Sequence, residues 1–115
     1  MPQLSHKDLS DNVRYIALSG YMDMKGTEAV EKSVTDLIAG NNRKVIIDLS
    51  DVTFLASVGI RLLIASGKQL KKNGGSIAMV VGQNAAVIKT VKATCGDAVF
   101  PLCETQDKAL AALNT

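Results

Sequence analysis

The sequence predicts an α/β fold with one domain, residues 1–115, built on a mixed β-sheet that is mostly parallel and has an antiparallel N-terminal edge. About four helices are expected to cover this sheet. Two patterns predict this class. Short runs rich in β-branched residues alternate with longer segments whose apolar residues recur at helical spacing. Strands connected through helices pair in parallel, whereas strands connected by a tight turn pair antiparallel.

The first two strands are predicted at the N-terminal end of the chain. Residues 13–18 form a β-branched and aromatic run that ends at Ser19 and Gly20. A weaker strand is expected over residues 4–9, with residues 11–12 (Asp-Asn) as the turn of a hairpin. This hairpin supplies the antiparallel edge of the sheet.

The middle of the chain predicts a helix, a buried strand and a second helix. Apolar residues at helical spacing indicate a helix over residues 27–39, which Thr27 would cap. Residues 44–49 form a nearly unbroken apolar run, typical of a central strand that is buried on both faces. A loop is expected over residues 50–56, followed by a helix over residues 57–73 that ends at an Asn-Gly-Gly sequence.

The last third of the chain continues the alternation. A strand is expected over residues 76–81, a helix over residues 84–93, and a short edge strand over residues 99–102, where a proline is tolerated. A C-terminal helix is expected over residues 105–113, with Thr105 as its cap and an aspartate in its first turn.

The charge of the chain argues against nucleic acid as a direct partner. Thirteen basic and 11 acidic residues give a net charge of only +2, and no face carries a dense stripe of Lys and Arg. The nearest approach to such a stripe is Lys68, Lys71 and Lys72, with Arg61 one or two turns earlier. Cations near the C-terminus of a helix are expected, because they face the negative end of its dipole.

Nothing in the sequence predicts a cofactor, a metal site or a membrane span. The two cysteines, Cys95 and Cys103, match no zinc-ligand spacing, and His6 is the only histidine. We expect both cysteines to be free thiols in a reducing compartment. No apolar run approaches the length needed to cross a bilayer, and the N-terminus has no apolar signal region. We therefore expect a cytoplasmic protein.

Binding sites in such folds lie where the carboxyl ends of strands lead into helices. Residues 20–26 and 50–56 are the two segments that qualify. The second leads into Ser57, expected at or near a helix N-cap, and Gly59, where glycine costs up to about 1 kcal/mol relative to alanine. A bare first turn offers free N–H groups and leaves the serine hydroxyl accessible to a partner. From spacing alone an equal alternative stands, in which Ser57 only caps the helix and Gly59 only makes room for a neighbouring strand.

Three motifs, in order and at similar spacing over essentially the whole chain, resemble the STAS domain family, in particular its bacterial anti-sigma factor antagonists. Residues 45–60 resemble the family's central strand, loop and helix start, where the motif Asp-Ser-Ser/Thr-Gly-Leu places the phosphorylated serine at Ser57. Residues 18–23 look like the family's Leu-x-Gly-x-x-Asp, which ends the preceding strand. Residues 71–75 resemble its Lys-x-x-Gly-Gly turn.

The resemblance implies a partner-switching protein that is not an enzyme. Unphosphorylated, it would bind an anti-sigma factor and so free a sigma factor. That anti-sigma factor would also be a serine kinase that phosphorylates Ser57 with its own ATP, and a serine phosphatase would reverse the step. We expect Asp23 and Asp48 to lie beside Ser57 and to add to the negative field there. The implied partner-binding residues are Asp23, Ala56, Ser57, Val58, Gly59 and Arg61.

The chain departs from the family motif at two positions, where Ala56 replaces the aspartate and Val58 replaces the second Ser/Thr. These departures leave open a scaffold or regulatory subunit of a signalling or membrane lipid-transport complex. An enzyme with Ser57 as nucleophile would need a base, but His6 is expected in an edge segment and no Gly-x-Ser-x-Gly elbow is present. A binder of a diffusible ligand is a further alternative, because such folds have crevices.

Overall fold

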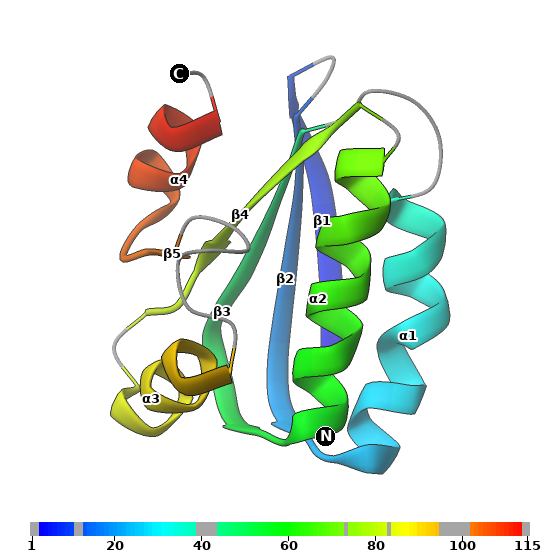
Figure 1. The fold of residues 1–115 in the computed structure, drawn as a ribbon, viewed down its shortest axis with the longest axis vertical. Helices are drawn as coiled ribbons and strands as arrows, with labels where there is room; N and C mark the ends of the chain where they lie inside the picture. The colour runs from blue at the N-terminus through cyan, green and yellow to red at the C-terminus, as the bar shows by residue number, and fades with distance from the viewer. Residues whose placement is uncertain are drawn as a thin grey trace.

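The computed structural model of the chain contains a single sheet with helices on both faces (Figure 1). It describes residues 3–10, 13–38, 44–72, 74–82, 84–94 and 102–113. The elements are β1 (Gln3–Ser10), β2 (Val13–Met22), α1 (Met24–Ile38), β3 (Lys44–Leu55), α2 (Ser57–Lys72), β4 (Ser76–Val80), α3 (Ala85–Thr94), β5 (Leu102–Cys103) and α4 (Gln106–Leu113). The strands lie in the order β1-β2-β3-β4-β5, with the first pair antiparallel and the others parallel. The fold class predicted from the sequence is confirmed.

Three helices cover one face of the sheet, and α4 covers part of the other (Figure 1). The larger core lies between the sheet and α1, α2 and α3, and includes Ile16, Leu18, Val45, Ile47, Val34, Leu63 and Val91. The smaller core lies under α4 and includes Val13, Ile46, Ala78, Val80, Ala109 and Leu113. Side chains of β3 enter both cores, as the unbroken apolar run of this strand predicts.

Two strands run further than the sequence predicts. β2 continues to Met22, and β3 continues through the expected loop to Leu55, so the prediction of a loop over residues 50–56 is wrong. The extensions pair with each other in parallel until Met22 lies opposite Leu55. The polar residues of this segment disfavour a strand locally, and pairing with β2 overrides that preference.

The helix ends follow the expected caps at two places. The Thr105 hydroxyl oxygen accepts a hydrogen bond from the N–H of Lys108 at 3.2 Å and caps α4. At the end of α2, Gly74 has a φ of 85° and the N–H of Gly75 donates to the Leu70 carbonyl at 2.7 Å. This is the Schellman arrangement, in which glycine adopts the left-handed conformation without a Cβ penalty.

The edge strand expected over residues 99–102 is found in part, as the two residues of β5 beside β4. The other residues of that prediction, the hairpin turn at residues 11–12 and Cys95 lie outside the described residues. Cys103 lies in β5 and is a half-buried thiol.

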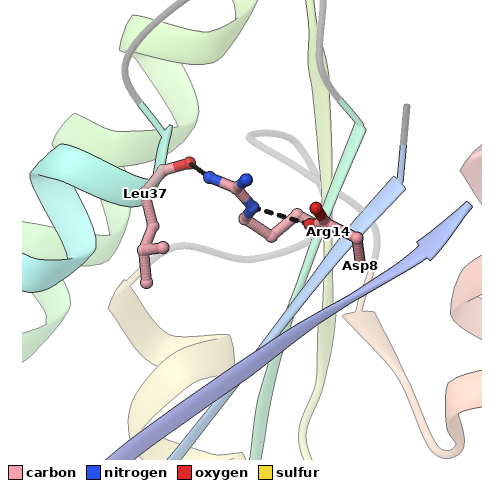
Figure 2. Close-up of polar contacts among 3 residues, drawn as sticks. All are labelled: Asp8, Arg14 and Leu37. Atoms are coloured by element: carbon pink, nitrogen blue, oxygen red, sulfur yellow. Dashed lines mark hydrogen bonds and ion pairs between the residues drawn. The ribbon is translucent and has the colours of Figure 1, made fainter. Parts of the chain in front are cut away.

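Arg14 joins the β1–β2 hairpin to the end of α1 (Figure 2). Its Nε donates to Asp8 Oδ1 at 2.9 Å across the strand pair, and a terminal guanidinium nitrogen donates to the Leu37 carbonyl at 2.8 Å. Carbonyl groups in the last turn of a helix have no partner within that helix, and they lie at the negative end of its dipole. The guanidinium therefore satisfies one such carbonyl and holds α1 against the edge of the sheet.

We expect Arg14→Ala to lower the free energy of unfolding by about 1–2 kcal/mol, because a charged donor to a part-buried carbonyl is lost. Arg61→Ala is the matched control, since Arg61 is exposed and makes no hydrogen bond or ion pair with any described residue. Its effect should stay within about 0.5 kcal/mol. Urea unfolding followed by circular dichroism measures both variants, and equal stabilities would contradict the role given to Arg14.

Candidate functional site

The helix α2 begins at Ser57, directly after β3 ends. The Ala56 carbonyl accepts hydrogen bonds from the N–H groups of Gly59 at 3.0 Å and Ile60 at 3.2 Å. Ala56 therefore occupies the N-cap position, and Ser57 is the first helical residue. Ser57 is exposed, and its hydroxyl makes no hydrogen bond with any described residue. The alternative in which Ser57 serves only as the cap does not agree with this geometry.

The first turn of α2 offers an anion-binding end. The N–H groups of Ser57 and Val58 precede the first hydrogen bond of the helix, and within the described part of the chain they have no acceptor. Such groups and the positive end of the helix dipole both favour negative charge. A phosphoryl group on the Ser57 oxygen would lie at this end of the helix, where local electrostatics tolerate it.

Asp23 lies beside this helix start because β2 and β3 end together. The N–H of Ala56 donates to the Met22 carbonyl at 3.0 Å. Asp23 and Ser57 are the residues that directly follow these two hydrogen-bonded residues in the chain. The two segments that the sequence singles out therefore meet at one edge of the sheet, although each connecting segment is a single residue rather than a loop.

The cap of α1 is Asp23, and the sequence prediction that Thr27 caps this helix is wrong. Asp23 Oδ1 accepts from the N–H of Gly26 at 2.8 Å, and the Asp23 carbonyl accepts from the N–H of Thr27 at 2.9 Å. α1 therefore begins at Met24, and Thr27 is buried within its first turns. The apolar periodicity used for the prediction starts only after Thr27, because the residues before it, Met24, Lys25 and Gly26, place no large apolar side chain in the core.

Two glycines make room for neighbouring groups at the starts of α1 and α2. A Cβ atom on Gly26 would lie 2.0 Å from the backbone carbonyl oxygen of Tyr21. A Cβ atom on Gly59 would lie 2.8 Å from Leu55 Cδ1 and 3.3 Å from the Thr27 hydroxyl oxygen. Gly59 therefore makes room for a neighbouring strand, as one alternative from the sequence expects, and also for α1.

Asp48 does not lie beside Ser57, contrary to expectation. It lies within β3, seven residues before Leu55, which corresponds to about 20 Å along a strand. Its Oδ2 accepts from the Tyr15 hydroxyl, and its Oδ1 accepts from the N–H of Ser50 at 2.8 Å. Burial, followed by the hydrogen bond to Asp48, raises the pKa of Tyr15 well above its ordinary value. The Asp48 carboxylate therefore stabilises the sheet rather than the helix start.

The other predicted site residues lie on the first turns of α2. Val58 is half-buried, and Arg61 is exposed one turn after Ser57. His6 lies in the edge strand β1, opposite Ile16. Among the described residues, no three His, Cys, Asp or Glu side chains lie close enough to hold a metal ion. None of the described helices combines the length and the apolarity that crossing a membrane requires.

The sequence analysis misses three exposed large apolar side chains, Tyr21, Met24 and Phe54, which lie at the ends of β2 and β3 and at the start of α1 and which we call the apolar cluster. Their exposed fractions are 57%, 63% and 43%, and no other large apolar side chain in the described part of the chain is exposed. The rings of Tyr21 and Phe54 stack with their centroids 5.1 Å apart. Aromatic and methionine side chains are enriched in protein interfaces. The signal available in the sequence was the placement of two of its few aromatics just before the two helix starts.

Known proteins resemble this chain in both sequence and fold. Residues 6–109 match the family model of the STAS domain. The anti-sigma-F factor antagonist RsfB of Mycobacterium tuberculosis is 29% identical over 101 residues, which cover 87% of this chain and 80% of RsfB. The crystal structure of an anti-sigma factor antagonist from Mycobacterium paratuberculosis gives a TM-score of 0.83 at 31% identity, covering 100% of this chain and 96% of that chain. Bacillus SpoIIAA in its phosphorylated form gives a TM-score of 0.68 at 16% identity over 95% of this chain and 97% of that one, which shows the fold alone.

We expect Gly26→Ala to lower the free energy of unfolding by about 2–3 kcal/mol, because the added Cβ meets a backbone oxygen that no side-chain rotation can move. Lys25→Ala is the control, since it truncates the exposed neighbouring residue and should change stability by less than about 0.5 kcal/mol. Thermal unfolding of the two variants makes the comparison. A Gly26→Ala protein as stable as Lys25→Ala would show that the first turn of α1 does not need this close approach to the Tyr21 carbonyl.

Proposed function

Since the chain belongs to the STAS domain family, we propose that it is an anti-sigma factor antagonist, which binds an anti-sigma factor and thereby releases a sigma factor. Relatives at 29% and 31% identity that carry this name support the proposal. In the proposed cycle the anti-sigma factor is also a serine kinase, Ser57 is its substrate, and a serine phosphatase restores the free hydroxyl. The chain itself acts by docking and not by catalysis, and ATP belongs to the kinase.

One observation carries this proposal. The Ser57 hydroxyl is exposed and makes no hydrogen bond with the described residues, at a helix start that lies beside the apolar cluster of Tyr21, Met24 and Phe54. A kinase needs an accessible hydroxyl, and a docking partner needs exposed apolar surface to bury. Both requirements are met at the same end of the molecule.

The physical effect of the phosphoryl group falls on the docking surface. A phosphoserine carries roughly −1.5 to −2 charges at pH 7. The free N–H groups at the start of α2 favour that charge within the chain, so the fold does not need to change. A partner that covers Ser57 would have to desolvate the phosphate. A loss of about 3–4 kcal/mol of binding free energy lowers affinity a few hundredfold, which is enough for a switch.

The remaining docking residues have different roles in this proposal. Val58 and Arg61 present side chains on the first turns of α2, Ala56 supplies the N-cap carbonyl before Ser57, and buried Gly59 lets this turn pack against Leu55 and Thr27. Asp23 caps α1 and contributes negative charge near Ser57 before any phosphorylation. The partner surface is therefore expected to carry apolar side chains together with basic ones.

A scaffold or regulatory subunit of a larger complex is the second candidate function. The observation that favours it is Ala56 at the N-cap, which leaves no carboxylate directly before Ser57. Size-exclusion chromatography of the native complex separates the two candidates. A heterodimer with the anti-sigma factor supports the antagonist, and a very large assembly without phosphorylated Ser57 supports the scaffold.

Incubation with the anti-sigma factor kinase, identified and purified from the native cells, is expected to place one phosphoryl group on Ser57, as mapped by mass spectrometry. Ser57→Ala should abolish the modification, whereas Ser50→Ala, which removes another exposed serine, should not. Ser57→Asp should weaken binding of the kinase and keep Tm within about 3 °C, because a carboxylate is tolerated in a first helical turn. Phosphate found on a different residue would overturn the site, and a large loss of Tm would mean that Ser57 is a packing residue.

We expect Phe54→Ser to raise the Kd for the same kinase about tenfold or more, because truncation removes half of the exposed aromatic stack. Its free energy of unfolding should fall by about 1–2 kcal/mol, since the Phe54 side chain is more than half buried and stacks on Tyr21, and this loss leaves the chain folded. Thr53→Ala is the control, because it changes the exposed residue directly before Phe54, and it should keep the wild-type Kd. Isothermal titration calorimetry measures both. Equal affinities for the two variants would remove the apolar cluster from the docking surface.

A further inference from the structure

A groove runs between α1 and α2. These two helices lie side by side and run in the same direction (Figure 1), and the hollow between them has a volume of about 650 Å³. Ile38 and Leu62 line it and are buried, whereas Val58 and Ala65 line it and are more exposed. A hollow of this size with apolar lining residues is typical of a binding site.

The charged residues that line the groove differ in sign between the two helices. Glu28 and Glu31 belong to α1, and Arg61 belongs to α2. All three are exposed, and none makes a hydrogen bond or an ion pair with a described residue. An occupant with a cation on the α1 side and an anion on the α2 side would complement both. A peptide provides both charges and an apolar surface together.

The length of the groove suits a short helix. Along α2 the lining residues lie between Val58 and Gln69, and the eleven helical steps that separate these two residues correspond to about 17 Å. A partner helix of about three turns has this length. Ala65 and Ser66, near the middle of the groove, have short side chains, and short side chains allow two helices to approach closely.

The groove is continuous with the proposed docking face. Val58, which directly follows Ser57, lines the groove, and so does Met24 of the apolar cluster. Met24 is 63% exposed, so it presents apolar surface at the boundary of the two regions. A partner that covers Ser57 can therefore extend into the groove without losing contact with the chain.

We propose that the groove between α1 and α2 binds an amphipathic helix of the anti-sigma factor, with a basic residue of that helix facing Glu31 and an acidic residue facing Arg61. This inference rests on the proposed function, because it names the part of that partner which docks here. It is a helix-in-groove interaction, with apolar anchors at helical spacing on the bound helix. The groove does not contain the Ser57 hydroxyl, so its contacts set affinity and partner choice rather than phosphoryl transfer.

The test uses the full chain and the purified anti-sigma factor kinase, with Kd measured by calorimetry. Ala65→Arg fills the middle of the groove and should raise Kd about thirtyfold or more. Ala111→Arg is the matched control, because Ala111 is an exposed alanine of α4 on the other face of the sheet, and it should keep the wild-type Kd. In steady-state phosphorylation of Ser57, Ala65→Arg should raise KM and leave kcat nearly unchanged.

The outcomes separate this inference from the proposed function. If the wild-type chain does not bind the kinase, the proposed function fails. If the wild-type chain binds and Ala65→Arg keeps both its Kd and its KM, only the groove is overturned. Glu31→Arg, at an exposed groove position that is not among the proposed docking residues, keeps the test decisive should Ala65→Arg not fold, since its Kd should rise about tenfold. A wild-type Kd for Glu31→Arg, or a small molecule or second copy of the chain found in the groove, would also overturn it.

Discussion

The arrangement of the docking end depends on one constraint, namely that β2 and β3 stay paired until both strands end. Met22 lies opposite Leu55, and the Met22 carbonyl then accepts the N–H of Ala56 at 3.0 Å. Because the strands end side by side, the helices that follow them also start side by side. At these starts a Cβ on Gly26 would meet the Tyr21 carbonyl at the end of β2, and a Cβ on Gly59 would meet Leu55 and Thr27. A slip of one strand would separate the helix starts and turn every core side chain of that strand to the wrong face.

Because of this geometry, the residues that stabilise the fold differ from those that set the charge near Ser57. The core residues lie between the sheet and the helices, whereas the Ser57 hydroxyl is exposed and takes no part in the core. The two acidic residues that the sequence analysis considers near Ser57 also differ in their positions. Asp23 caps α1 at the docking end, whereas Asp48 pairs with Tyr15 far along β3. Asp23 and the start of α2 therefore both contribute to the field at Ser57, whereas Asp48 is remote, and an added phosphate would change the surface more than the interior.

The order of the elements was predictable, because apolar periodicity alone distinguishes strands from helices in this chain. The residues at which the elements end were less predictable. Residues 50–56 contain several polar residues and resemble a loop, yet pairing with β2 holds most of them in a strand. The stack of Tyr21 and Phe54 depends on the register of two strands, which no local pattern specifies. Ser57 emerged as a site from family resemblance, since its spacing alone fitted a simple helix cap equally well.

In the proposed function, the position of Ser57 relative to the two apolar surfaces lets a single hydroxyl control docking. Successive side chains of a strand point to opposite faces, so Tyr21 and Phe54 lie on the opposite face of the sheet from Met22 and Leu55, which pack in the core beneath the helices. The groove lies on the helical side, and Ser57 lies at the strand ends between the two surfaces. In the proposed cycle, a partner that contacts both surfaces covers Ser57, so a phosphate there would oppose the whole interface rather than one contact.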